Sequence, residues 1–178
     1  MKRDLPDRAA LRQPRGDTNE DGVTLNFGSL AEGLGYTLRR AQLASFKSFQ
    51  QVFGESGITP AQYSALLIIE LNPGLRQNQV SDALGIKRAN FVGLIDKLEE
   101  RGLVERTPAA DRRSYALHLT AVGCKFVTEL HTLNMMHEQR LRATLNRQQL
   151  TLLLDGLNAV VASVDESAAR NSATDEEI

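Results

Sequence analysis

The sequence predicts a mainly α-helical protein with a small β-wing, that is, a winged helix-turn-helix with N- and C-terminal dimerisation helices. Three observations predict this fold class. Two short helical segments meet at a glycine turn, two segments of alternating polarity follow them, and long segments with helical apolar spacing lie before and after this unit. The 178 residues, 42% of them hydrophobic and 24% charged, suffice for one compact domain with helical extensions.

Residues 1–25 mix charged side chains with several prolines and glycines and have no apolar period, which predicts a flexible tail. They contain no apolar stretch of the kind found in secretory signals. No apolar run anywhere in the chain approaches the roughly 18 residues that cross a bilayer. We therefore expect a cytoplasmic protein, associated with the nucleoid when it is bound to DNA.

Residues 29–57 predict the first long helix, which starts at Ser29 and is ended by Gly54 and Gly57. Its apolar residues fall on two sides, whereas a helix on the surface of a monomer needs one stripe. Two stripes predict burial against the chain's own core and against a second chain; a helix at the centre of a monomeric bundle is the alternative. One stripe comprises Leu30, Leu34, Leu38, Ala41, Ser45, Phe49 and Val52, and the other Tyr36, Leu43, Phe46 and Phe53.

The next helix begins with a strong capping signal. Thr59 at the N-cap, Pro60 at the first helical position and Gln62 two residues later form a capping box with its expected proline. Asn72-Pro73-Gly74 ends this helix. Its apolar body is expected to comprise Tyr63, Leu66, Leu67, Ile69 and Leu71.

Two short helices joined by Gly85-Ile86 form a helix-turn-helix pattern. The first spans Gln77 to Leu84, and the second spans Lys87 to Arg101 and is capped by Gly102. The second helix carries its cations at its start. The residues expected to point inward are Val80, Ala83 and Leu84 on the first helix, and Phe91, Leu94, Ile95 and Leu98 on the second.

Residues 103–107 and 115–119 alternate in polarity and predict two strands, with a protruding loop between them. Thr120 then caps a long helix that runs to about Thr144. A second capping box at Asn146 opens a last helix, whose stripe recurs close to every 3.5 residues, as in a helix-helix seam. That stripe comprises Leu150, Leu153, Leu154, Leu157, Val160, Val161 and Val164.

The order of these elements resembles the MarR family of bacterial regulators over roughly residues 30–165. The Asp-X-Arg loop, which lies about ten residues past a Gly-Leu-Val and is followed by Leu-Thr, is specific in combination with the other motifs. The resemblance implies a transcriptional repressor that binds a palindromic double-stranded operator as a homodimer and is released by a small molecule. The motifs are Thr59-Pro60-Ala61-Gln62-Tyr63, Leu84-Gly85-Ile86, residues 94–104, Asp111-Arg112-Arg113 and Leu119-Thr120-Ala121-Val122-Gly123.

This resemblance and the element order divide the chain into four kinds of segment. We expect a DNA-binding lobe at residues 59–120 and a helical dimerisation region at 29–57 and 121–168. Flexible tails are expected at 1–25 and, with an acidic character, at 169–178. The residues expected at the dimer seam are Leu30, Leu34, Leu150, Leu154, Leu157 and Val161.

A recognition helix places its N-terminal residues nearest the base edges in the major groove. The candidates for DNA contact here are Lys87, Arg88 and Asn90, with Lys97 further along the same helix. Several members of the family have an arginine at the position of Gly93, so this chain departs from that pattern and the weight shifts to Arg88 and Asn90. A solvated charged face without DNA contact is the alternative.

The loop between the strands carries Arg112 and Arg113, and arginine is drawn into narrow, negative minor grooves. By resemblance to the family, Arg113 is the first choice for this contact. Asp111 lies poorly beside phosphate, so we expect it to orient the wing or one of its arginines through a charge-assisted hydrogen bond.

Family members release DNA when a small, often aromatic ligand binds between the dimerisation helices and the DNA-binding lobe. Residues 38–42 resemble members that control aromatic-acid catabolism, some of which bind acyl-CoA thioesters. An aromatic acid or an acyl-CoA is therefore the expected effector. The candidate ligand-binding residues are Tyr36, Arg39, Arg40, Phe46, Phe49 and Tyr63, for which core packing plus a solvated arginine pair is the alternative.

The remaining residue types point away from an enzyme. The three histidines lack metal-ligand spacing, and there is no glycine-rich phosphate loop, so we expect no catalysis, no metal and no cofactor. The single cysteine, Cys124, excludes an internal disulfide. We expect it at a buried position, where a thiol is inert; a redox-responsive regulator that uses Cys124 is one alternative function.

The net charge of −1 argues against a protein that coats nucleic acid indiscriminately, but not against sequence-specific binding, because the local surface decides it. Between Ile86 and Arg113 there are seven basic and five acidic residues, whereas the segment after Val164 is acidic. A helical protein-interaction module without DNA binding is the other alternative function.

Overall fold

A computed structural model of the chain describes residues 22, 25–108 and 115–175, and for 166–175 it describes the backbone alone. The chain divides into two compact units, residues 1–47 and 48–178, and each is described by itself. Nearly all of the tail expected at 1–25 lies outside the described residues.

The N-terminal unit begins with a short 3-10 helix, η2 (Gly28–Glu32), followed by α1 (Leu34–Phe53), which continues into the second unit. The expected helix start at Ser29 is wrong, because Gly33 adopts an extended conformation with ψ of 130° and separates the two helices. Ahead of η2, the ring of Phe27 stacks on Tyr36 with 5.7 Å between centroids.

The second unit continues with the end of α1, the 3-10 turn η3 (Gly54–Ser56) and α2 (Pro60–Leu71). The capping box is confirmed: the Gln62 amide donates to Thr59 Oγ1 over 3.3 Å, and the Thr59 amide donates to Gln62 Oε1 over 3.0 Å. Tyr63, Leu66 and Ile69 are buried on α2 as expected. Leu71 is not, since it is 76% exposed in the last turn.

The helix-turn-helix is confirmed as α3 (Gln77–Ala83) and α4 (Arg88–Glu100). Gly85 lies between them with φ of 62°, a left-handed conformation that disfavours any residue with a Cβ. On α3 the inward residue beside Val80 is Ser81, whose hydroxyl donates to the Asn78 carbonyl oxygen over 2.8 Å. Ala83, expected to point inward, is exposed.

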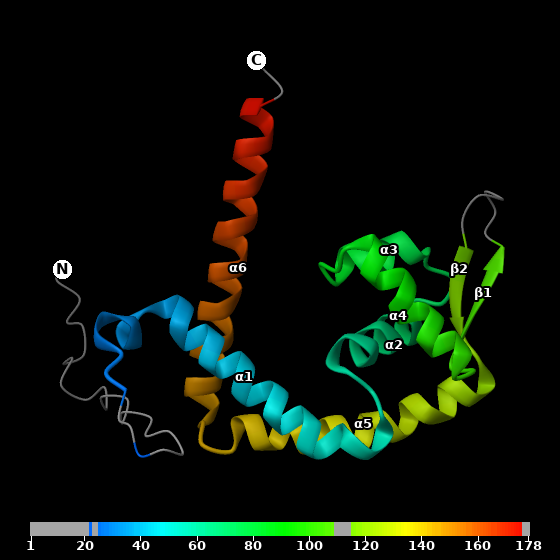
Figure 1. Cartoon of the computed structure of the whole chain (residues 1–178), viewed down its shortest axis with the longest axis horizontal. Helices are drawn as coiled ribbons and strands as arrows, with labels where there is room; N and C mark the ends of the chain where they lie inside the picture. The colour runs from blue at the N-terminus through cyan, green and yellow to red at the C-terminus, as the bar shows by residue number, and fades with distance from the viewer. Residues whose placement is uncertain (1–21, 23–24, 109–114, 176–178) are drawn as a thin grey trace. The chain divides into compact units, whose positions relative to one another are not determined.

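The wing is an antiparallel hairpin of β1 (Val104–Pro108) and β2 (Tyr115–Leu119), in which Val104 pairs with Leu119. The segment before α3 lies on the other edge of β2 (Figure 1), where the Leu117 amide donates to the Leu75 carbonyl oxygen over 2.9 Å. These hydrogen bonds hold β2 of the hairpin against the segment that leads into α3, so the position of the hairpin relative to α3 is fixed.

Helix α5 (Ala121–Arg142) starts at the Thr120 cap, as expected, and packs against the hairpin through Gly123. A Cβ at Gly123 would overlap the backbone carbonyl oxygen of Leu103, so only glycine permits this approach. Because the inward side of α5 runs through Gly123 and Val127, the expected burial of Cys124 is wrong, and its side chain is exposed.

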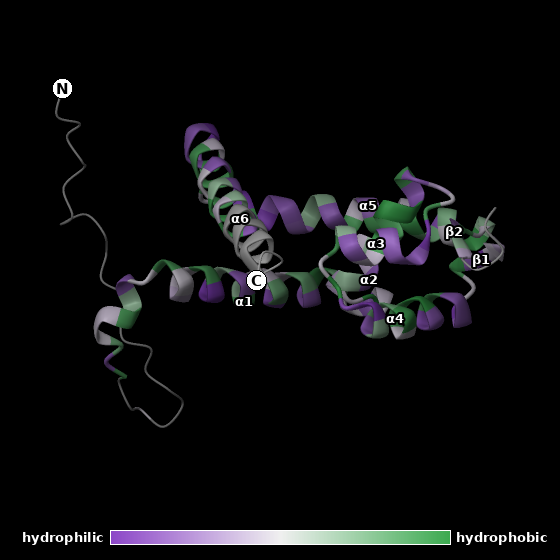
Figure 2. Ribbon diagram, turned by 90° about the horizontal axis from the view of Figure 1, so that it is seen from above, coloured by the Kyte–Doolittle hydropathy of each residue, from purple (hydrophilic) through white to green (hydrophobic). Residues whose placement is uncertain are grey.

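The last helix, α6 (Arg147–Asp175), opens with the expected capping box at Asn146, whose Oδ1 accepts from the Gln149 amide over 2.9 Å. It continues to Asp175, through most of the segment expected to be a flexible tail. No residue from Arg147 to Asp165 is buried within one chain, and polar and apolar residues mix along this helix (Figure 2). None of the helices in the described ranges is long and apolar enough to span a membrane.

The core of the second unit lies where α2, α3, α4, α5 and the hairpin meet. Phe91, Ile95 and Leu98 of α4 are completely inaccessible to solvent, and they hold the outward side of that helix in a fixed orientation. The other fully enclosed apolar residues of this core include Phe53, Ala65, Leu66, Val80, Leu117, Val127 and Leu130.

Candidate nucleic-acid interface

Helix α4 presents its cations to solvent because its opposite side is anchored in the core. Lys87 is the N-cap, and Arg88 and Asn90 lie in the first turn, all three exposed beside the buried Phe91. Such an arrangement leaves the first turn free to enter a major groove while the core fixes the direction in which it points.

Arg88 forms an ion pair with Asp82 of α3, with 3.4 Å between Nη2 and Oδ2. Their side chains are 71% and 59% exposed. An ion pair so open to water contributes little, typically about 0–1 kcal/mol. Arg88 is therefore held only weakly by Asp82.

The predicted contact residues of α4 lie on two flanks of the helix. Asn90 and Lys97 are seven residues apart, about two turns, so they lie on the same side. Arg88 and Lys97 are nine residues apart, about two and a half turns, so they lie on opposite sides. Gly93 stands between the flanks with open space where a Cβ would be, so it leaves room on the outward surface.

Arg106 of β1 is a residue that the sequence reasoning missed. Its guanidinium binds Asp96 of α4, with 2.6 Å between Nη2 and Oδ1, and its Nη1 donates to Glu99 of the same helix. Its Nε donates to Gln77 of α3 over 3.2 Å, and its side chain is only 18% exposed. One side chain thus ties the wing to both helices of the helix-turn-helix.

In the sequence, Arg106 follows the acidic residues of α4 by only a few positions. This spacing does not by itself show that a side chain of the strand reaches back to the helix. The pairing also changes the charge that α4 presents. Asp96 and Glu99 lie on a helix expected to approach phosphates, and Arg106 offsets the negative charge there.

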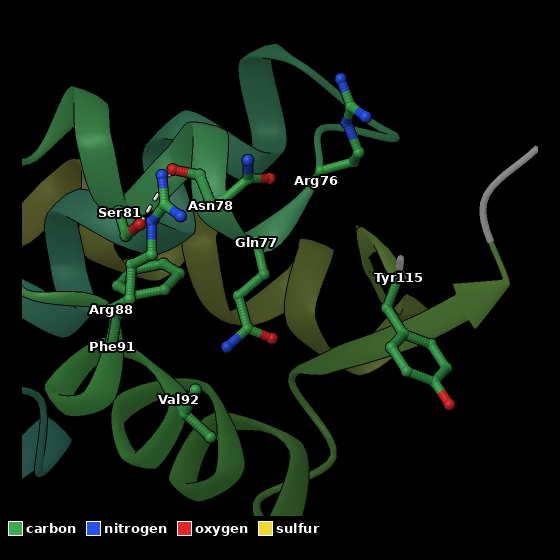
Figure 3. Close-up of a pocket in the computed structure, with 8 residues that line it drawn as sticks. All are labelled: Arg76, Gln77, Asn78, Ser81, Arg88, Phe91, Val92 and Tyr115. Carbon is green, nitrogen blue, oxygen red and sulfur yellow. Dashed lines mark hydrogen bonds between the residues drawn. The ribbon is translucent and has the colours of Figure 1, made fainter. Parts of the chain in front are cut away.

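A hollow of about 370 Å³ lies between α3, α4 and β2 (Figure 3). Two arginines, three further polar side chains, two apolar side chains and one tyrosine line it. Arg88 and Tyr115 stand at opposite edges in this view, with Gln77 pointing into the space between them. The lining residues are Arg76, Gln77, Asn78, Ser81, Arg88, Phe91, Val92 and Tyr115.

The predicted wing residues Asp111, Arg112 and Arg113 lie outside the described residues, which stop at Pro108 and resume at Tyr115. Pro108 and Tyr115, the described residues on either side of this segment, are paired across the two strands. Their contacts with DNA stay a prediction.

An aromatic cluster joins the end of α1 to α2 and α5, away from α4. Phe49 and Phe53 stack with 4.0 Å between centroids, and His137 meets the ring of Phe49 edge-on at 5.6 Å. A 3.0 Å hydrogen bond joins His137 Nδ1 to Ser48 Oγ. Burial lowers the pKa of His137, and nearby Arg140 adds to this while Glu138 opposes it.

Tyr63 lies against this cluster, 5.2 Å from Phe53 between ring centroids, with 9% of its surface exposed. Its hydroxyl is buried and has no hydrogen-bond partner among the described residues. Burial raises the pKa of Tyr63, and the carboxylates of Glu138 and Glu70 add to the increase. A buried donor without an acceptor is costly, and a bound ligand or water satisfies it.

The predicted ligand-binding set falls in two units of the chain. Phe49 and Tyr63 belong to the second unit and to the aromatic cluster. The others belong to the first unit, where the Arg40 guanidinium lies 6.0 Å from the ring centroid of Tyr36. Arg39 and Phe46 are exposed there, and the complete set of six stays a prediction.

The structure defines a winged helix-turn-helix DNA-binding protein. Its recognition helix is anchored in the core and carries cations on its first turn, Arg106 ties the hairpin to that helix, and a hollow lined in part by arginines lies between them.

Comparison with known proteins identifies the family. A sequence model of the MarR family matches residues 56–114. The regulatory protein for the hcr operon of Thauera aromatica is 34% identical over 162 residues, which cover 89% of this chain and 98% of that protein. The chain belongs to the MarR family.

Solved structures agree with this assignment. The transcriptional repressor CouR bound to a 23-mer DNA duplex is 41% identical, with a TM-score of 0.74, over 78% of this chain and 99% of that one. CouR bound to p-coumaroyl-CoA is 39% identical, with a TM-score of 0.72, over 77% and 97% of the two chains. The predicted fold class is confirmed, and the chain is a DNA-binding transcriptional regulator of this family.

Proposed function

We infer that this regulator is a repressor that holds a palindromic operator as a homodimer and releases it when an aromatic acid or its CoA thioester binds. The observation that supports operator reading is the first turn of α4, where Lys87, Arg88 and Asn90 are exposed above a buried Phe91. Arginine and lysine pair with guanine or phosphate, and asparagine pairs with adenine. Arg112 and Arg113 add minor-groove contacts, and Lys97 adds a contact on the flank of Asn90.

Two observations support an aromatic acyl ligand. The relative CouR, 39% identical, has been solved with p-coumaroyl-CoA, an aromatic acyl thioester. The Tyr63 hydroxyl is a buried donor with no partner among the described residues, and it lies beside the rings of Phe49 and Phe53, which are buried against each other. We propose that the rings move apart to admit an aromatic acyl group, whose carbonyl or phenol oxygen then accepts from Tyr63.

The repressor acts in the cytoplasm, at the nucleoid, and catalyses no reaction. Its relatives are transcriptional regulators. Among residues 25–108 and 115–175, no three histidine, cysteine or acidic side chains gather in a way that would hold a metal ion. The exposed Cys124 lies on α5, outside the cluster of aromatic residues and outside α4.

The test is a fluorescence anisotropy titration of the dimer against duplexes that the protein itself selects from a random library. One duplex class with a two-fold symmetric consensus is expected. Addition of p-coumaroyl-CoA or another aromatic acyl-CoA is expected to release the duplex, whereas CoA alone is not. Failure to enrich any sequence would reject the operator, and release by no aromatic acid or thioester would reject the ligand class.

A further inference from the structure

Arg101, the C-cap residue of α4, makes contacts at the end of that helix which lies away from the first turn. Its Nη1 donates to the Gly57 carbonyl oxygen over 3.1 Å, and its Nη2 donates to the Ser56 carbonyl oxygen over 3.0 Å. Both carbonyls belong to the turn η3 and its C-cap, which directly follow α1. Two donors of one planar guanidinium on adjacent carbonyls hold the end of α4 at a defined position against this turn.

The same guanidinium also contacts α5. Its carbon Cζ lies 5.1 Å from the centroid of the Phe126 ring, within the range of a cation–π interaction. Phe126 is half-buried and packs against the core. Where the structure describes the chain, the hydrogen bonds between the end of α4 and residues 53–59 all come from Arg101. One side chain therefore joins α4 to η3 and to α5.

The turn η3 is bonded directly to the aromatic cluster. The Ser56 hydroxyl donates to the Phe53 carbonyl oxygen over 2.6 Å. The ring of Phe53 is completely inaccessible to solvent and stacks on Phe49. Because close-packed interiors transmit displacement, a shift of this ring reaches its own backbone and then Ser56. The contacts therefore run without a gap from the aromatic rings through η3 to Arg101.

We propose that Arg101 is the positioning residue that couples the aromatic cluster to the recognition helix α4. When a ligand separates the rings of Phe49 and Phe53, η3 shifts, and the hydrogen bonds of Arg101 carry the shift to the C-terminal end of α4. This inference rests on the proposed function, since it needs a ligand at the cluster and an operator at α4. It adds the side chain through which one site acts on the other.

The attachments of α4 explain why its first turn responds. The Thr120 hydroxyl donates to the Gly102 carbonyl oxygen over 2.5 Å, so the start of α5 also holds this end of α4. When η3 moves and Thr120 stays in place, one of two attachments shifts, and α4 tilts. The helix has 13 residues and a length of about 20 Å, so a tilt that begins at Arg101 displaces Arg88 at the opposite end.

The first experiment needs no ligand, because coupling between two sites acts in both directions. Hydrogen exchange is measured with and without the selected operator for the wild-type dimer, for Arg101→Gln and for Lys125→Gln, which removes an exposed cation from α5 as the matched control. Operator binding is expected to slow exchange at residues 53–59 of the wild type and of the control. In Arg101→Gln the operator is expected to protect α4 and to leave residues 53–59 unchanged.

Two outcomes of this experiment overturn the proposal. One is an exchange rate at residues 53–59 of the wild type that the operator does not change, and the other is an equal response of these residues in Arg101→Gln. Wild-type binding of the operator in the same samples shows that operator reading itself stands. Should Arg101→Gln fail to fold, Arg101→Lys replaces it, with one cationic donor in place of two and a partial loss of the response.

The second experiment measures the coupling with p-coumaroyl-CoA as the probe. The ratio of the operator Kd with and without the probe gives the coupling factor, which is typically about 5–150-fold. Arg101→Gln is expected to bring this ratio close to one, whereas calorimetry on the DNA-free dimer is expected to show unchanged probe affinity. A merely structural role would alter operator affinity or thermal stability and keep the wild-type ratio, which would overturn the proposal. If the probe does not release the wild type, the proposed ligand class is rejected and the exchange experiment decides the role of Arg101.

Discussion

The helix-turn-helix lobe and α6 use their apolar residues in opposite ways. In the lobe, Phe91, Ile95 and Leu98 of α4 are fully enclosed within one chain. In α6, Leu154 and Val161 remain 51% and 61% exposed. The lobe therefore completes its own core, whereas the stripe of α6 leaves apolar area in water, which costs about 25 cal/mol per Å². The lobe is complete within one chain, whereas α6 is not, which fits the proposal that α6 pairs with a second copy.

The largest expected effect breaks α6 and spares the lobe. Leu154→Asp combined with Leu157→Asp places two carboxylates in the seam. The dimer is expected to dissociate. Operator affinity is then expected to fall by about 10²–10⁴-fold, because the two DNA-binding lobes are no longer linked and must bind their half-sites independently. Sedimentation and anisotropy measure the two effects. A variant monomer that binds the full operator like the wild type would contradict the comparison.

The second prediction breaks the lobe. Phe91→Ala removes a fully buried ring from α4 and leaves a cavity, so the free energy of unfolding is expected to fall by about 3–5 kcal/mol. Denaturant unfolding followed by circular dichroism measures it at fixed protein concentration. The matched change Leu152→Ala on α6, at a side chain 64% exposed in one chain and outside the predicted stripe, is expected to cost far less.

The third prediction concerns the link between the wing and α4. Arg106→Gln removes charged hydrogen bonds to Asp96 and Glu99, at a cost of about 1.5–3 kcal/mol. Operator affinity is expected to fall about tenfold, because the wing is no longer held against α4 and two carboxylates of that helix lose their counter-charge. Adding Asp96→Asn and Glu99→Gln to this variant is expected to restore part of the affinity, since the unpaired carboxylates are gone. No restoration would show that Arg106 acts by geometry alone.

The fourth prediction tests the wing tip, whose structure is outside the described residues. Arg113→Ala is expected to weaken operator binding several-fold and to lower its salt dependence, because one cation leaves the minor groove in each subunit. Arg142→Ala on α5 serves as the control, since Arg142 pairs with Glu138 of its own helix. An unchanged salt slope for Arg113→Ala would remove the wing from the DNA interface.

The smallest expected effect sharpens the lobe. Gly93→Ala replaces a glycine inside α4 at a position with open space for the new methyl group. The free energy of unfolding is expected to rise by about 0.5–1 kcal/mol, because alanine favours the helix. Thermal unfolding of both proteins, at matched concentration, gives the difference. A decrease in stability would mean that α4 is not a continuous helix through this position.

The fold was predictable where local chemistry decides it. The capping boxes at Thr59 and Asn146 and the turn at Gly85-Ile86 are set by residues that are neighbours in sequence, and each was confirmed. Cys124 shows the limit. Whether it or Gly123 faces inward depends on the approach of Leu103, a contact twenty residues away that periodicity does not contain.

In the candidate site, too, the features set within one element were predictable and the contacts between elements were not. The cations on the first turn of α4 follow from a helical pattern, and their exposure matches the expectation. Arg106 was missed because it binds from a strand to two helices, α3 and α4. Such roles depend on how elements pack together, which a pattern within one element does not encode.

The close packing of α5 at Gly123 has a mechanical consequence. His137 follows Gly123 by 14 residues on the same helix, a separation of about 21 Å along the axis. The two ends of this stretch contact different things: the hairpin base at one end, and the aromatic cluster of α1 and α2 at the other. Because α5 is held closely at Gly123, a tilt of the helix by about 5° would move its His137 end by about 2 Å. A movement of this size is large enough to make or break a hydrogen bond at the Tyr63 hydroxyl.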